Sequence, residues 1–178
     1  RDLLPPTLGG LRRPRLAPVM VAAGVIAILL PSAQSVVQFD RLISQPDNRL
    51  LARGWVERQF PPGTTLAQLG APAGHVFLGD ANEKEYLRVP FARRGARPDL
   101  VIVYWSPIRP GPPPELRSIG RVLAREYELG FARDVVGADP DNIYDWQDDF
   151  YLPLAGFKGI ERPGPNLKIY IRRGAFPH

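Results

Sequence analysis

The longest uncharged stretch of the chain lies near its start, where no acidic or basic side chain occurs from Leu16 to Phe39. As an α-helix, this run would rise about 1.5 Å per residue and reach roughly 36 Å, which exceeds the ~30 Å hydrocarbon core of a bilayer. A transmembrane helix is therefore the favoured interpretation. A secretory signal peptide and a buried helix of a soluble protein remain open, because a basic region before an apolar core is also how a signal peptide begins.

The charges beside this run indicate its orientation. Four arginines precede it, and three of them lie close to its start, at Arg12, Arg13 and Arg15. Because basic residues stay on the cytoplasmic side, we predict a cytoplasmic loop over 1–15, a transmembrane helix over 16–39 and an extracytoplasmic domain over 40–178. This places the protein in the cell membrane. The net charge of +5 lies mostly in that flank, and no basic stripe follows, so no nucleic-acid partner is expected.

An amphipathic helix is predicted directly after the membrane segment, over 46–60. Ser44 is the expected N-cap, and Pro46 fits the first turn. Four large apolar side chains share one face of this helix: Leu51, Trp55, Val56 and Phe60. We expect this face to pack on the external domain.

Short apolar and alternating segments predict a β-sheet in the rest of the chain. The residues 100–105 form a continuous β-branched and aromatic run, as in a strand buried on both faces. Leu167, Ile169 and Ile171 alternate with polar residues, which predicts a strand with one buried face. Three further strands are predicted, over 64–69, 75–78 and 131–136. The pattern over 75–78 is the weakest of the three.

A second helix is predicted over 115–129, with Gly130 as its terminator. The order strand, helix, strand across 100–136 fits one right-handed βαβ unit. The expected fold is therefore a small extracytoplasmic α/β domain with a mixed or parallel sheet, preceded by one transmembrane helix.

The composition of the chain excludes several common kinds of catalytic site. The chain has no cysteine, which excludes disulfides and thiol nucleophiles, and only two histidines. His75 begins an apolar segment without ligand spacing and is expected to be structural. No glycine-rich phosphate loop and no serine nucleophile motif occurs. We therefore assign no catalytic residue and no cofactor to this chain.

An acidic and aromatic segment is the one concentrated feature. Asp139, Asp141 and Asp145 could gather oxygen ligands for a divalent cation. Aromatic rings among carboxylates are also a common sugar-binding mixture, which makes four residues candidates for glycan or acceptor contact: Tyr144, Trp146, Asp148 and Asp149. The alternative is a solvated loop whose aspartates cap turns.

Several motifs resemble the C-terminal region of polyprenyl-phosphate-dependent membrane glycosyltransferases, the protein mannosyltransferase-like and aminoarabinose transferase-like enzymes. The motifs are Asp47-x-Arg49-x-x-Ala52-x-x-Trp55, Pro62-Gly63-Thr64, Arg97-Pro98-Asp99 before an apolar strand, Phe150-Tyr151-Leu152-Pro153-Leu154 and Arg162-Pro163-Gly164-Pro165. The resemblance implies the last membrane helix and an extracytoplasmic domain of such an enzyme, with a lipid-phosphate-linked sugar donor.

The resemblance places no catalytic residue on this chain. It implies that the catalytic residues lie upstream, and that the partners are the membrane, the remaining transmembrane part of the same enzyme and the lipid-linked donor. Two other functions remain open. One is a single-pass anchored envelope domain that binds a glycan or a protein without catalysis, and the other is a secreted domain that binds calcium.

Overall fold

The structure is a computed structural model that describes residues 16–70, 74–78, 86–91, 95, 97–107, 114–135 and 159–175. The chain forms two compact units, Arg1–Val37 and Gln38–His178.

Helix α1, Leu16–Ile43, contains the uncharged run. It is long and apolar enough to cross a membrane by length and composition, criteria that a signal sequence near an N-terminus also meets. Its large apolar side chains are exposed, with Ile28 at 76% and Met20 at 72%. Among the described residues these side chains have no protein core around them, which favours an anchor or a signal sequence over a buried helix of a soluble protein.

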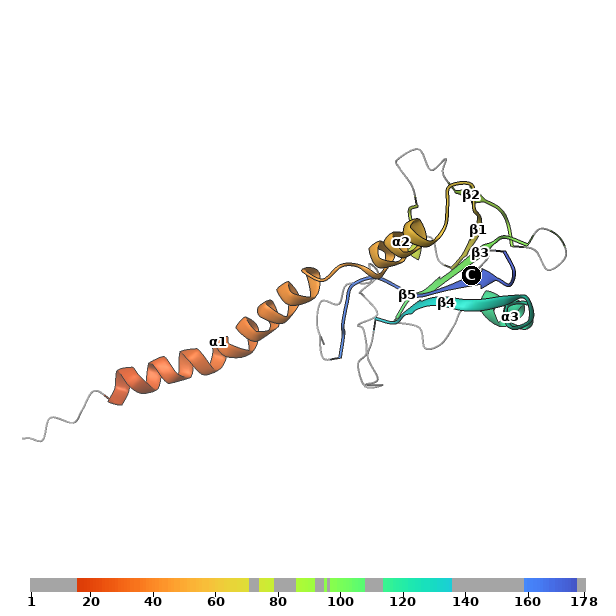
Figure 1. Cartoon of the computed structure of the whole chain (residues 1–178). Coiled ribbons are helices and arrows are strands. Elements are labelled where there is room, and N and C mark those ends of the chain that lie inside the picture. The colour runs from red at the N-terminus through yellow and green to blue at the C-terminus, as the bar shows by residue number, and fades with distance from the viewer. Residues whose placement is uncertain are drawn as a thin grey trace, which may run out of the picture. The chain divides into compact units, whose positions relative to one another are not determined.

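The second unit contains a mixed five-stranded sheet in the order β2-β1-β3-β5-β4 (Figure 1). Its strands are β1 Thr65–Leu69, β2 Leu87–Arg88, β3 Leu100–Trp105, β4 Tyr127–Arg133 and β5 Asn166–Arg172. β1 pairs in parallel with β2 and β3, whereas β5 is antiparallel to both of its neighbours. The predicted α/β fold with a mixed sheet is thus confirmed.

The predicted βαβ unit needs a correction. β3 and β4 are both antiparallel to β5, so they run parallel to each other, but β5 lies between them and pairs with both. The chain leaves β3, passes through helix α3, Pro114–Glu126, and returns as β4 with a gap of one strand. The unit is therefore a split βαβ, which is completed only when the C-terminal strand inserts.

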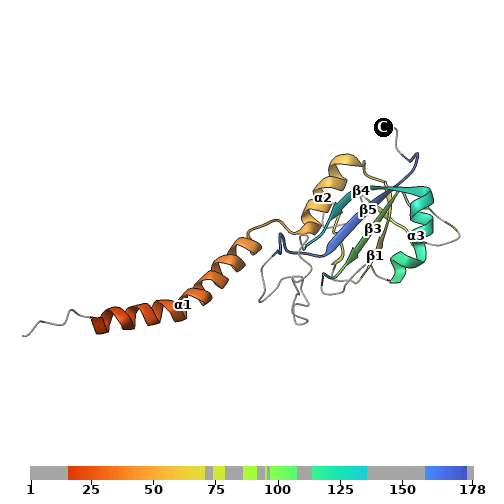
Figure 2. The ribbon, with the colours of Figure 1, turned by 90° about the horizontal axis from the view of Figure 1, so that it is seen from below.

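Two helices cover opposite faces of the sheet (Figure 2). Helix α2, Asn48–Gln59, packs its buried Ala52 and Val56 on one face, together with strand side chains such as Ile102 and Ile169. Helix α3 packs Ile119 and Leu123 on the other face. β3 is buried on both sides, as its continuous apolar sequence predicts.

Helix α2 confirms its predicted apolar face but not its predicted cap. Asp47 is the N-cap, and its carboxylate accepts a hydrogen bond from the Arg49 backbone amide at 2.7 Å. The Ser44 hydroxyl instead donates to the Arg41 carbonyl in the last turn of α1. A carboxylate one residue before the helix satisfies its free amides better than a hydroxyl four residues away.

Tertiary pairing also moved the predicted boundaries around Gly130. The helix ends at Glu126 and β4 begins at Tyr127, because β4 pairs with β5 there instead of extending the helix. Gly130 is not a helix terminator but lies at a register shift within β4. A Cβ atom at Gly130 would lie 2.5 Å from Ile171 and 2.9 Å from the Trp55 ring, so the missing side chain lets Trp55 pack on the strand.

The predicted strand over 75–78 is absent. The Gln68 side chain makes both hydrogen bonds that a neighbouring strand would make to Val76. The Val76 backbone amide donates to the Gln68 side chain oxygen at 2.9 Å. The Gln68 nitrogen donates to the Val76 carbonyl at 2.8 Å. The segment is therefore fixed to β1 by a side chain and not by a strand ladder.

Candidate functional site

The carboxyl ends of β1, β3 and β4 lie at one edge of the sheet, because these three strands are parallel to one another. We call this the carboxyl edge; it comprises the described residues that follow these strands and those that precede β5. Ligands of open α/β sheets bind preferentially at this edge, where the loops that follow adjacent strands separate. After β1 the chain adds Val76 and Leu78 to the core beneath α2, whereas after β3 it continues into α3 on the opposite face.

Two glycines allow β1 and β3 to end close together. Gly70 has a φ of +147°, and a Cβ atom there would overlap the Tyr104 carbonyl oxygen and ring. A Cβ atom at Gly74 would overlap the same ring. The Tyr104 side chain, 3% exposed, thus packs beneath the backbone that follows β1. Only glycine fits at Gly70, where both the backbone conformation and the space exclude a side chain.

His75 lies beside this turn and is half-buried. Its ring makes edge-on contacts with Phe77 and Tyr104, with centroids 5.4 Å and 6.4 Å away. The imidazole Nε2 is 3.3 Å from the Gln68 amide nitrogen. Within the described residues, no group of three or more histidine, cysteine, aspartate or glutamate side chains is placed to hold a metal ion. His75 therefore sits in an aromatic and amide environment that fixes its orientation.

The start of α2 is joined to the segment that leads into β5. The backbone amide of Asn48 donates to the Pro163 carbonyl at 3.1 Å, and the side chain nitrogen of Asn48 donates to the Pro165 carbonyl at 3.1 Å. Gly164, with a φ of +108°, packs so closely on Asp47 that a Cβ atom would lie 2.6 Å from the carboxylate. These contacts fix the 163–165 segment against the first turn of α2.

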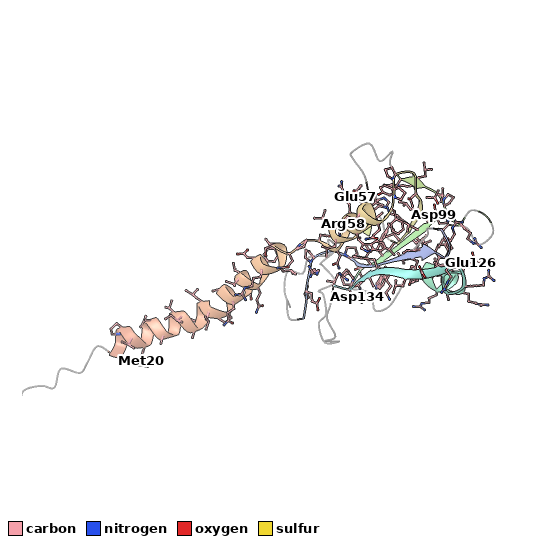
Figure 3. The ribbon with its side chains drawn as sticks, viewed as in Figure 1. Met20, Glu57, Arg58, Asp99, Glu126 and Asp134 are labelled. Atoms are coloured by element: carbon pink, nitrogen blue, oxygen red, sulfur yellow. The ribbon has the colours of Figure 1, made fainter. Side chains whose placement is uncertain are left out.

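The two ends of the acidic segment also meet at the carboxyl edge. The Val135 amide donates to the Asn166 side chain oxygen at 2.8 Å, and the Glu161 amide donates to the Val135 carbonyl at 3.0 Å. Asp134 is exposed at the start of the segment, near this edge (Figure 3). The sequence-predicted site residues lie outside the described residues: Asp139, Asp141, Tyr144, Asp145, Trp146, Asp148 and Asp149.

A polar cluster joins three strands at the opposite edge of the sheet, where Figure 3 shows Asp99 and Glu126. The Asp99 carboxylate accepts from the Thr65 amide at 3.1 Å and hydroxyl at 2.6 Å, and it pairs with Arg172 at 2.6 Å. Burial alone raises the pKa of Asp99, but the hydrogen bonds from Thr65 and Arg172 outweigh it and lower the pKa below the ordinary 3.8. This cluster stabilises the register of β1, β3 and β5.

The sequence alone did not show that Asn48 and Asp99 make hydrogen bonds that join distant segments of the domain. Asp99 stands directly before an apolar strand, but its partners are separated from it by 34 and 73 positions, so no local pattern shows them. Asn48 is 0% exposed and bonds a residue 117 positions away. A buried asparagine in the first turn of a helix has the same sequence signature as an exposed one.

Asn48 offers a test of the junction between α2 and the 163–165 segment. Replacing Asn48 with aspartate removes the donor to the Pro165 carbonyl and buries a charge that faces a carbonyl oxygen, so we expect the free energy of unfolding to fall by about 3 kcal/mol. Asn48→Ala removes the same donor without a charge and should cost about half as much. Urea unfolding followed by tryptophan fluorescence measures both, and equal losses would show that the buried charge carries no penalty here.

The chain was compared with protein-family models, with curated proteins and with solved structures, and nothing matched in any of the three.

Proposed function

We propose that this chain is the C-terminal membrane helix and extracytoplasmic domain of a membrane glycosyltransferase that uses a sugar donor linked to a lipid phosphate. The observation that carries the proposal is the contact between two segments that resemble this family. The segments 47–55 and 162–165 are far apart in sequence but meet through Asn48 and Asp47. Residues that pack together in this way are expected to form one motif of a shared domain.

The position of this contact supports a role close to the membrane surface. Helix α1 ends at Ile43 and α2 begins at Asn48. Five residues span at most about 18 Å, so the start of α2 stays within that distance of the end of the apolar helix. The 163–165 segment is hydrogen-bonded to the start of α2, so it stays close to the end of the apolar helix as well. In this role the domain closes the site over the donor or guides the acceptor, and the reacting residues belong to other membrane helices of the same enzyme.

The coding sequence upstream of Arg1 tests the enzyme assignment directly. The proposal predicts several further membrane spans in frame with Arg1 and an acidic external loop among them. An initiation codon immediately before Arg1 would overturn it, and would leave a single-pass anchored domain that binds a glycan or a protein without catalysis.

The predicted orientation is tested by thiol labelling of the chain 1–178, whose sequence contains no cysteine. Asp134→Cys introduces a single thiol at an exposed position of the domain, and Arg12→Cys introduces one before α1. In intact cells, a membrane-impermeant maleimide should label the Asp134→Cys protein and leave the Arg12→Cys protein unlabelled until the membrane is permeabilised. The reverse pattern, or equal labelling of both, would contradict an extracytoplasmic domain.

A further inference from the structure

A groove of about 480 Å³ lies between α3 and the strands β4 and β5. On the helix side it is lined by Leu116, Gly120 and Ala124, and on the sheet side by Leu129 and Tyr170, among others. Its size is within the 300–1,000 Å³ typical of ligand sites. Leu129 is 53% exposed, so an apolar side chain of β4 is open to solvent beside the groove.

Gly120 keeps the groove open. A Cβ atom at Gly120 would meet nothing within 4 Å. Leu116, Gly120 and Ala124 are spaced four residues apart, so they form one stripe along α3, and a glycine in the centre of this stripe leaves a hollow. Burial raises the pKa of Tyr170, and its hydroxyl has no hydrogen-bond partner among the described residues. The groove thus offers an apolar wall and a polar group for a ligand.

The strand beside the groove is an edge strand. β4 is the last strand in the sheet order, and among the described residues no strand pairs with its outer side. Half of the backbone amides and carbonyls of such a strand point away from its partner. An extended peptide that pairs with β4 satisfies these groups. Every second side chain of this peptide then projects toward the face of the sheet that α3 covers, where the groove lies.

The charge around the groove is positive on balance: three arginines, Arg117, Arg121 and Arg173, lie in or beside it, against the single carboxylate of Glu128, which also lines it. Arg117 and Arg121 are exposed on the side of α3 next to the stripe, since they lie about 100° from Leu116 and Gly120, respectively, on the helix. Neither has an ion-pair partner among the described residues. Arg173 is exposed at the end of β5 and also lines the groove. An acidic partner complements these three guanidinium groups.

We propose that an extended acidic peptide binds here as an added strand on β4, with its apolar side chains in the groove along α3 and its carboxylates near Arg117, Arg121 and Arg173. The unused backbone groups of β4 favour a polypeptide over a lipid surface, because a lipid headgroup does not satisfy a row of alternating donors and acceptors. The proposal is independent of the glycosyltransferase assignment.

A second copy of the chain is a poor partner for this edge. It would bring its own Arg117, Arg121 and Arg173 to the joint, and like charges facing each other oppose pairing. The partner is therefore a different segment.

Fluorescence anisotropy with the full chain in detergent tests the proposal. The probe is a labelled ten-residue peptide of alternating valine and glutamate. The matched peptides are alternating valine and lysine, which reverses the charge, and ten glutamates, which keep the charge without strand propensity. We expect only the valine–glutamate peptide to bind, with an affinity that falls as salt rises. Equal binding of the ten-glutamate peptide would overturn strand addition, because charge alone would then suffice.

Two variants locate the binding. A Cβ atom at Gly120 meets nothing within 4 Å, so Gly120→Leu directs its side chain into the groove, and leucine favours the helix over glycine. We expect the fold to be retained while the affinity falls about tenfold or more. Gly120→Ala fills little of the groove and should bind nearly as well as the natural chain. Full binding by Gly120→Leu would overturn the assignment to this groove.

The role of the arginines is tested with the double variant Arg117→Glu and Arg121→Glu, which should weaken peptide binding about tenfold. Arg58→Glu makes a charge reversal on exposed α2, on the opposite face of the sheet, and should leave the affinity unchanged. Equal losses in both proteins would show a non-specific charge effect and overturn the proposal. A second outcome would also overturn the proposal: no peptide binds, the natural chain binds phosphatidylglycerol vesicles, and the double variant does not. The arginines would then bind a lipid surface.

Discussion

Replacing Gly70 with alanine is expected to lower the free energy of unfolding of the domain by about 3 kcal/mol or more. The Gly70 φ of +147° is one that L-residues rarely adopt, and a Cβ atom would overlap the Tyr104 carbonyl oxygen. Because a backbone atom is the obstacle, the strain is not relieved by a change of rotamer. Either β1 and β3 separate at their carboxyl ends or the turn is rebuilt, and both changes disturb the buried Tyr104 ring.

The matched control is the same substitution at Gly120. A Cβ atom there meets open space, and alanine favours a helix by about 1 kcal/mol over glycine, so Gly120→Ala should raise the free energy of unfolding. Urea unfolding of the full chain in detergent, followed by tryptophan fluorescence, measures both variants. A loss below about 1 kcal/mol for Gly70→Ala would mean that the close approach to Tyr104 is not required.

Asp99→Asn should lower the free energy of unfolding at pH 7 by about 2 kcal/mol. The substitution keeps the size of the side chain but removes the charge that binds Thr65 and Arg172. The effect is expected to depend on pH. The pKa of Asp99 is lower in the folded protein than its ordinary 3.8, so its contribution is fully present above about pH 5 and is lost as the pH falls through the folded pKa.

The difference between the natural chain and Asp99→Asn should therefore be constant from pH 7 to about pH 5 and shrink below about pH 4. Asp134→Asn is the control, because Asp134 is exposed and has no described interaction partner. It should behave like the natural chain throughout. A difference for Asp99→Asn that stays the same down to about pH 2 would show that the charge of Asp99 does not stabilise the fold.

Local patterns were sufficient for elements whose signal is contained in their own residues. The uncharged run predicts α1, the four-residue spacing of Leu51 and Trp55 predicts the packed face of α2, and the alternation after Asn166 predicts β5. Arg53 and Glu57 form an ion pair at 2.7 Å for the same local reason, because residues four apart are neighbours on any helix.

Local patterns failed where a partner distant in sequence decides the structure. The residues 127–129 continue the helical periodicity of α3, yet they join β4 because β5 offers a complete backbone ladder. The residues 75–78 have the composition of a strand, but the Gln68 side chain occupies their hydrogen-bonding groups. In both segments the competing interaction comes from residues outside the sequence window that carries the pattern.

Some parts of the candidate sites can be recognised in the sequence, and others cannot. The acidic and aromatic segment is evident in the sequence, and the positions of Asp139, Asp141 and Asp145 remain a prediction. The groove between α3 and β4 is not evident, because its walls belong to elements that the sequence alone does not place side by side. The same holds for the contact between Asn48 and Pro165, which are 117 positions apart.

The sequence by itself determined that a long apolar helix precedes an α/β domain with little catalytic chemistry. Only the tertiary structure decided that β5 separates β3 from β4, which makes β4 an edge and opens the groove beside it. The physical reason is that periodicity reports which face of an element is buried. It does not report which strand supplies the neighbouring hydrogen bonds, since any strand with a matching face and length can do so.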